Sequence, residues 1–249
     1  MAKMTVLDMV QDILSDMNSD EVNSISDSLE STQVARIIES TYFEMMANKN
    51  WPHLKQLNTL NSSGDSAKPT HMKMPDDIKE LHVVQYNKIK DGETRQRWSD
   101  IEYVTPDAFL RKMSDLNSDN SIVESVTDHS GVQLLVKNNR APEYYTSFND
   151  EWLVFDSYDN TVDTTLQTAK TRCTMTMSPT FTLEDSHIPD LPVEGFPALL
   201  AEAKSTCFAR IKQMPDGKSE QQAKRQRSWL SRKGYQSGSA MEFPDYGRN

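Results

Sequence analysis

The sequence lacks the patterns that would define a function class at once. Only eight of its 249 residues are glycine, and none stands in a GxGxxG or GxxxxGKS/T pattern, so no loop typical of nucleotide-phosphate binding is present. The two cysteines, Cys173 and Cys207, cannot build a disulfide framework and show no metal-binding spacing. No apolar run approaches the roughly 20 residues of a membrane-spanning helix. We expect reduced, structural cysteines and no membrane segment.

Core-forming residues are also scarce. Leu, Ile, Val and Phe together make up 50 of the 249 residues, about 20%, which lies near the border below which highly charged chains stay disordered. The net charge of -10 also opposes compaction. The aromatic residues and 13 methionines nonetheless favour a folded chain with a thin core that neighbouring subunits complete. The acidic balance argues against a free, sequence-reading DNA-binding protein, and the acidic start MAKMTVLDMVQDIL indicates a cytoplasmic protein without a basic leader.

Apolar residues recur at intervals of three and four near both ends of the chain, which is typical of amphipathic helices. The spacing predicts a helix near residues 6–17, a second one that ends before Pro52, and a late one whose stripe begins at Phe196. Pro215 then breaks the late helix, and a second, polar piece runs to about Lys233.

The middle of the sequence changes to an alternation typical of strands. Segments rich in Val, Thr, Tyr and Trp alternate imperfectly between apolar and polar residues from about residue 81 to residue 177. Asn149 and Asp150 form a compact turn, so residues 144–158 are predicted to be a hairpin. One helix interrupts the strands, with Pro106 at its first position.

These patterns predict an α+β fold in which N- and C-terminal helices form a helical bundle with an inserted β-rich region. The predicted segments are the N-terminal helices of the bundle at 1–52, an inserted β-rich domain at 53–189, the C-terminal helices of the bundle at 190–233, and an extended C-terminal tail at 234–249. The tail is rich in Gly and Ser, and we expect it to need a partner surface in order to fold.

Charge is distributed unevenly along the chain. Residues 1–30 hold one basic and seven acidic side chains, whereas residues 202–233 hold nine basic and three acidic ones. If the two segments lie together in one bundle, the asymmetry predicts ion pairs within the chain, and if they face different subunits it predicts head-to-tail contacts in a ring. Two ordinary solvated helix faces are the third interpretation.

Catalytic and metal-binding patterns are weak. The five histidines are scattered, without an HExxH motif or a pair at helical i, i+4 spacing. The segment DLNSDNS from Asp115 begins like a calcium loop but lacks the later glycine and glutamate, so we predict a surface turn. The acidic run at 156–163 is predicted to cap turns. A hydrolase that uses Cys173 with His187, or an Asp/His pair, stays an alternative, but we expect no enzyme, no cofactor and no metal.

The strongest functional signal is the basic segment KSEQQAKRQRSWLSRK at residues 218–233. Its cations suit contact with phosphate groups without sequence reading, and they equally suit the C-terminal dipole of a helix or contact with another protein. Non-specific nucleic-acid binding by this segment is therefore the alternative function. The candidate DNA or partner contacts are Lys224, Arg225, Arg227, Arg232 and Lys233.

Four stretches together resemble one known family. They are ANKNWPHL after the second predicted helix, MPDDIKELHVVQY at the first strands, RAPEYYTSFNDEWLVFDSYDNTVDTTLQ around the hairpin, and FPALLAEAKSTCFARIK in the late helix. From about Met4 to Lys233, the chain resembles the tail tubular protein A family of short-tailed phages, which are head-to-tail adaptor proteins. The Trp51 junction and residues 144–163 carry most of the resemblance, and neither is a catalytic fingerprint.

The resemblance implies a structural role in a phage virion. Members of the family form a ring, usually of twelve subunits, between the portal and the tail nozzle, around the channel through which DNA leaves. The implied partners are the portal protein, the nozzle (tail tubular) protein, tail fibre or spike proteins, and further copies of the chain in a dodecameric homo-oligomer. Genomic DNA would pass without sequence-specific binding. The implied location is the neck and tail of the virion, after assembly in the host bacterial cytoplasm.

In related adaptors a C-terminal extension docks onto the portal protein. By this resemblance, the extension of the present chain is the predicted tail at residues 234–249. Its docking anchors would be the large side chains that it contains, namely Tyr235, Met241, Phe243 and Tyr246.

Overall fold

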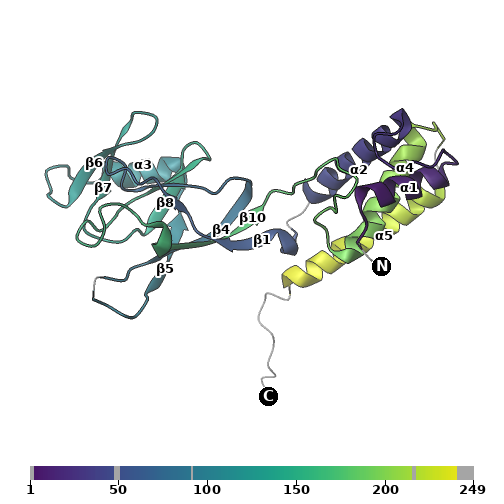
Figure 1. The fold of residues 1–249 in the computed structure, drawn as a ribbon. Helices are drawn as coiled ribbons and strands as arrows, with labels where there is room; N and C mark the ends of the chain where they lie inside the picture. The colour runs from purple at the N-terminus through teal and green to yellow at the C-terminus, as the bar shows by residue number, and fades with distance from the viewer. Residues whose placement is uncertain (1–2, 48–50, 91, 215–216, 240–249) are drawn as a thin grey trace, which may run out of the picture. The chain divides into compact units, whose positions relative to one another are not determined.

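The chain folds as two compact units (Figure 1). The computed structural model describes residues 3–47, 51–90, 92–214 and 217–239, the last ten of these by their backbone alone. We call residues 1–54 together with 179–249 the helical unit, and residues 55–178 the β-rich unit. No helix within the described ranges combines the length and the apolar character that crossing a membrane requires.

The first helix of the helical unit, α1, spans Val6–Asp16. It begins there because Thr5 forms a capping box with Asp8. The amide of Asp8 donates to the Thr5 hydroxyl at 3.1 Å, and the amide of Thr5 donates to the Asp8 carboxylate at 3.0 Å. The predicted apolar stripe faces the core, since its residues are at most 5% exposed; they are Val6, Val10, Ile13, Leu14 and Met17, and Met9 is buried as well.

Three longer helices belong to the same unit: α2 at Leu29–Ala47, α4 at Phe196–Arg210 and α5 at Gly217–Ser239. α4 packs against α1, α2 and α5. Pro197 lies in the first turn of α4. Proline has no amide proton, but amides in the first turn of a helix have no partner within the helix, so no hydrogen bond is lost. After α2, the chain turns through a short 3₁₀ helix at Pro52–Leu54, and Trp51 joins the core with only 8% of its surface exposed.

Ion pairs inside the helical unit join the acidic N-terminal segment to the basic late segment. Lys204 on α4 pairs with Asp16 on α1 and lies 3.7 Å from Asp12, and Lys212 pairs with Glu30 at 3.0 Å. The ion pairs within the chain that the charge asymmetry allowed are therefore present. Because these groups are partly exposed, each pair contributes at most about 1 kcal/mol.

The β-rich unit is built on an eight-stranded mixed sheet in the order β1-β10-β4-β5-β8-β9-β3-β2. Its strands are β1 Lys55–Asn58, β2 Asn61–Ser62, β3 His71–Lys73, β4 Ile78–Asn87, β5 Trp98–Tyr103, β8 Tyr144–Ser147, β9 Trp152–Phe155 and β10 Thr171–Met177. Neighbouring strands are antiparallel except for β5 and β8, which are parallel. The sheet curls into a half-barrel, and its apolar cluster includes Val84, Tyr145, Phe155, Cys173 and Met175.

The pairing of β4 leaves an opening in this sheet. β4 pairs with β10 from Ile78 to Tyr86, but with β5 only from Val84 to Asn87. β5 in turn pairs with β8 only at its last two residues, Glu102 and Tyr103. The first half of β4 therefore separates from β5 and β8, and the sheet is open there.

A two-stranded sheet and one helix accompany the half-barrel. β6 at Val123–Thr127 and β7 at Gln133–Lys137 form an antiparallel hairpin. Helix α3 at Pro106–Ser114 begins at the predicted proline. Phe109 and Met113 of α3 form a small cluster with Leu134 and Val154, so this helix packs on strands rather than on other helices.

The predicted fold class, a helical bundle with an inserted β-rich region, is wrong. The fold is α+β with a β-rich core: within the described ranges it has a curled eight-stranded mixed sheet, a small second sheet and five helices, of which α3 lies on the strands. The β-rich region is not an insertion that depends on a helical core. By curling, its strands bury an apolar cluster of their own and form a self-supporting layer.

Predictions of single elements had different outcomes. The hairpin is confirmed, since β8 and β9 pair antiparallel around the turn that holds Asn149 and Asp150. The strands β1, β2, β3 and β6 are not predicted by the sequence, because they have two to five residues without clear alternation. Helix α5 continues to Ser239, so the backbone of residues 234–239, including Tyr235, is helical. Met241, Phe243 and Tyr246 lie outside the described residues.

Candidate interaction site

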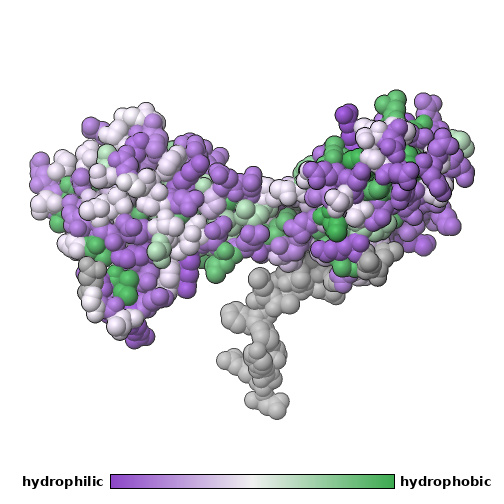
Figure 2. Space-filling view, in the orientation of Figure 1, coloured by the Kyte–Doolittle hydropathy of each residue, from purple (hydrophilic) through white to green (hydrophobic). Residues whose placement is uncertain are grey.

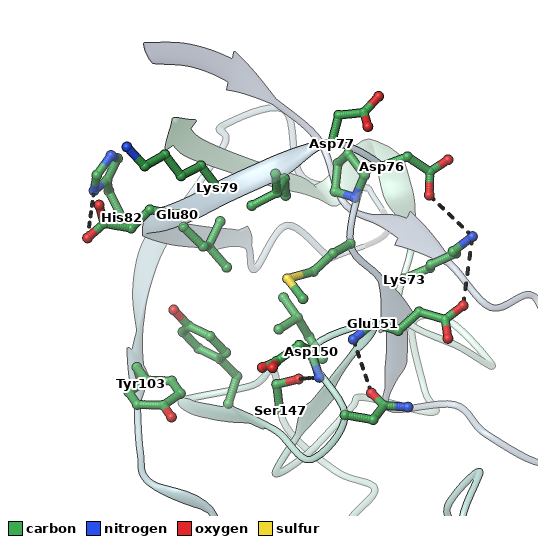
Figure 3. Close-up of a pocket in the computed structure, with 17 residues that line it drawn as sticks. Lys73, Asp76, Asp77, Lys79, Glu80, His82, Tyr103, Ser147, Asp150 and Glu151 are labelled. Carbon is green, nitrogen blue, oxygen red and sulfur yellow. Dashed lines mark hydrogen bonds and ion pairs between the residues drawn. The ribbon is translucent and has the colours of Figure 1, made fainter. Parts of the chain in front are cut away.

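A cleft of about 810 Å³ opens in the β-rich unit where β4 separates from β5 (Figure 3). One wall is the β3–β4 connection and the first half of β4, and the other is the end of β5 with β8 and the β8–β9 turn. Leu81, Tyr145 and Leu153 give it an apolar floor, because they belong to or pack against the core of the half-barrel. The volume lies within the range of roughly 300–1,000 Å³ that is typical of binding sites.

Two tight turns place carboxylates at this cleft. Asp77 and Asp150 have φ angles of 62° and 57°, in the left-handed region that Asp and Asn tolerate better than most residues. The amide of Ser178 donates to the carbonyl oxygen of Asp77 at 2.6 Å, and the amide of Asp150 donates to the Ser147 hydroxyl at 3.0 Å. Both turns are therefore held by hydrogen bonds that do not involve the two carboxylates.

The cleft carries a net negative charge. Its ionisable lining consists of the cations Lys73 and Lys79, the imidazole of His82, and the carboxylates of Asp76, Asp77, Glu80, Asp150 and Glu151, which gives a formal charge of -3 with His82 neutral. Lys73 reaches toward two of the acids, with Nζ 3.5 Å from Asp76 and 3.9 Å from Glu151 (Figure 3). A concave site with a net charge of one sign concentrates ions and groups of the opposite sign.

An exposed aromatic ring lines the wall opposite the β3–β4 connection. Tyr103 is 54% exposed, although its neighbour Tyr145 is only 5% exposed. The two rings meet edge to face, with centroids 5.5 Å apart. Burial raises the pKa of Tyr145 to about 12, so its hydroxyl stays neutral at physiological pH. In Figure 3, Tyr103 lies across the cleft from Asp76 and Asp77.

The predicted basic contacts lie on α5 and not in the cleft. Ser219 and Ala223, four residues apart, are buried, so this face of α5 lies toward the core. Lys224 and Arg225 are exposed, and Arg227 pairs with Glu202 of α4 at 2.9 Å. The backbone of Arg232 and Lys233 is helical, but their side chains are not described.

The cysteine-based hydrolase finds no support in the structure. Cys173 is 1% exposed, its thiol donates to the carbonyl of Asn58 at 3.3 Å, and burial raises its pKa to about 11. Cys207 is completely buried as well. His187 belongs to the helical unit, where its ring packs on Phe181. Both thiols are therefore protonated and covered, unlike reactive cysteines.

An Asp/His pair does exist, but it is buried. His71 of β3 and Asp128 of the β6–β7 turn approach to 3.0 Å, with side chains 0% and 9% exposed. Burial lowers the pKa of His71 more than its contact with Asp128 raises it, so the imidazole is neutral. The pair ties the tip of the β6–β7 hairpin to the main sheet, which is a structural role.

Of the other acidic segments, the one that begins like a calcium loop and the one at Asp159 form turns as predicted, whereas Asp156 does not cap a turn. In the segment that begins like a calcium loop, the Asn117 and Asn120 side chains accept hydrogen bonds from the amides of residues 119 and 122. Asp159 caps its own turn, and Asp156 accepts the amides of Glu143 and Tyr144 at 2.9 Å each. Within the ranges that the structure describes, no group of three His, Cys, Asp or Glu residues is placed to hold a metal ion.

Comparison with known proteins adds no relationship. No protein-family model matches the chain, and no curated protein matches its sequence significantly.

The sequence predicts one of the two turns of the cleft, but not the cleft itself. The pattern Asn149-Asp150 predicts the β8–β9 turn, whereas the turn before β4 was missed, although Pro75-Asp76-Asp77 is a signal that could have predicted it. What brings these turns to one opening is the separation of β4 from β5, and no local pattern encodes where two strands stop pairing.

Proposed function

We propose that this chain is a structural, non-catalytic head-to-tail adaptor of a tailed phage, which assembles as a ring between the portal and the tail nozzle around the DNA exit channel. The observation that carries the proposal is the sequence resemblance from about Met4 to Lys233, which includes the Trp51 junction and the hairpin around Asn149. In the structure, Trp51 belongs to the core of the helical unit, and the hairpin lines one side of an open cleft.

Surface chemistry supports an assembly role. Large apolar side chains are exposed in both units, among them Leu29 at 78%, Leu57 at 73% and Val83 at 44%. Leu57 and Val83 both lie beside Thr174, so they form one row across β1, β10 and β4. Figure 2 shows such apolar groups scattered over a mainly hydrophilic surface. Scattered single side chains are ordinary on a protein surface, but a contiguous row such as that of Leu57 and Val83 suits contact with a partner protein.

The decisive experiment is assembly with the portal protein of the same phage. The chain and the portal protein are each run alone and then mixed, on size-exclusion chromatography with light scattering. The mixture should show a complex larger than either protein alone. Absence of any complex at every salt concentration would overturn the adaptor proposal.

The tail is tested separately with the substitutions Met241→Ser, Phe243→Ser and Tyr246→Ser in one variant. These are large side chains of the predicted docking tail, so we expect weaker portal binding, and the far-ultraviolet circular dichroism spectrum checks that the fold is retained. Unchanged portal affinity would remove the tail from the docking surface without affecting the adaptor proposal.

Nucleic-acid binding by α5 is the competing function, because Lys224 and Arg225 are exposed. It predicts duplex binding that weakens steeply with salt and is abolished by Arg225→Gln with Arg227→Gln. The adaptor proposal predicts weak duplex binding that these two substitutions barely change, with portal assembly retained.

A further inference from the structure

The structure points to a second property, which goes beyond the adaptor role: we propose that the cleft between β4 and the β8–β9 turn is a docking site for an extended, lysine- or arginine-bearing segment of a partner protein. The occupant is inferred from the charge, the floor and the aromatic wall of the cleft.

The charge of the cleft determines which charge its occupant carries. The lining has a formal charge of -3, and Lys73 already lies beside two of the five carboxylates. Asp77 and Asp150 stand on turns whose backbones are held independently of their side chains. A cationic segment therefore meets two exposed carboxylates on turns that are already formed, so binding requires no rearrangement of the backbone.

The shape of the cleft favours an extended chain over a single ion. No three acidic groups in the described part of the chain converge on one point, so the carboxylates line the rim without forming a metal cage. Between them, Leu81 and Leu153 offer an apolar floor. An extended segment points alternate side chains in opposite directions, so it can place apolar residues on this floor while its cations reach the rim.

Tyr103 supplies a contact that selects cations. Its ring is 54% exposed at the cleft, and an aromatic face attracts a guanidinium or ammonium group. The same unit already uses this contact elsewhere. The Lys112 ammonium lies 3.9 Å from the ring centre of Tyr144, and the Arg172 guanidinium lies 4.1 Å from that of Trp98.

The test uses the full-length protein and a pool of fluorescein-labelled peptides of the pattern KxKxRxK, in which x is a mixture of Ile, Val, Phe and Tyr. Matched pools carry Gln or Glu in place of every cation. Fluorescence anisotropy should give the tightest binding for the basic pool and none for the acidic pool. Equal binding of the basic and neutral pools would overturn the proposal.

Variants then locate the binding. Asp77→Asn with Asp150→Asn removes two charges while keeping residues that tolerate a positive φ, so the turns are retained. We expect affinity for the basic pool to fall about tenfold. The control, Asp65→Asn with Asp119→Asn, makes the same charge change at exposed positions outside the cleft. An equal loss in both double variants would show a general charge effect and refute the assignment to this cleft.

A third variant separates the aromatic contact from charge. Tyr103→Leu keeps an apolar side chain at this exposed position. It should lower the affinity for the basic pool by about fivefold and leave the weak affinity for the neutral pool unchanged. Because none of these measurements involves the portal protein, their failure leaves the adaptor proposal standing, and failure of portal assembly leaves the cleft assignment standing.

Discussion

The buried contact between His71 and Asp128 should be a major support of the β-rich unit. Asp128 is 8% exposed. Its carboxylate accepts the Ser130 amide at 2.8 Å, the Ser130 hydroxyl at 2.6 Å and His71 Nε2 at 3.0 Å. Beside it, the ring of His129 stacks on Trp152 at 4.2 Å. The substitution Asp128→Ala removes the acceptor and leaves a buried imidazole N–H without a partner.

The size of the effect follows from the pKa of Asp128. Burial alone raises that pKa, but the hydrogen bonds from Ser130 and His71 outweigh burial and lower it from 3.8 to about 2. A difference of this size corresponds to about 2 kcal/mol of stability at neutral pH. The buried His71 N–H that is left without an acceptor adds about 1–3 kcal/mol to the loss of stability. Since the two contributions overlap, we expect Asp128→Ala to lower the unfolding free energy by about 3 kcal/mol.

The assay is urea unfolding at pH 7, followed by circular dichroism and by the fluorescence of the four tryptophans, one of which is Trp152. The substitution Asp119→Ala at an exposed position is the control and should change stability by less than about 0.5 kcal/mol. Because folding lowers the pKa of Asp128, its contribution is complete above about pH 4 and is lost as pH falls toward 2. The stability difference between the wild type and Asp128→Ala should therefore shrink in acid. An unchanged free energy at pH 7, or a difference that grows as pH falls, would refute this reasoning.

Three further predictions concern the helical unit and the thiols. Both cysteines should resist a thiol reagent at pH 8 until the protein is unfolded, because burial raises their pKa values to about 11 and about 12; rapid labelling of the native protein would contradict this. Gly195→Ala should cost about 1–3 kcal/mol in thermal or urea unfolding, since its new methyl group would lie 2.7 Å from a carbon atom of Leu191; a more stable variant would show that the contact relaxes freely. Burial raises the pKa of Glu30, but the hydrogen bonds from Lys212 and Ser19 together lower it by more, so the net pKa is below its usual value. Glu30→Gln should therefore destabilise the protein slightly at pH 7 and progressively less below about pH 4.5, as urea midpoints across pH would show.

Local patterns in the sequence identify the elements better than their assembly. The α1 stripe from Val6 to Leu14, the helix that starts at Pro106 and the turn at Asn149 depend on neighbouring residues, and all three are confirmed. The fold class is wrong because the half-barrel depends on pairings between distant segments. One of the two partners of β4 is β10, whose residues follow about ninety positions later.

The candidate residues show the same division. The basic residues of α5 are visible as a charge run, and the structure places Arg227 in an ion pair with Glu202 that the run itself does not reveal. The His71–Asp128 contact joins residues 57 positions apart, so neither partner stands out in its local sequence. The cleft is the clearest case, since it arises where the pairing between two strands ends.

The left-handed conformations of Asp77 and Asp150 restrict what can replace them. At a positive φ, the backbone accepts Gly, Asn and Asp at low cost. Gly and Asn are neutral and Asp carries one negative charge, so substitution at either position changes the charge of that side chain only between zero and minus one. The potential of the cleft is therefore adjustable in single steps while the fold around it stays the same. Related chains could evolve preferences for more or less basic partners through these two positions alone.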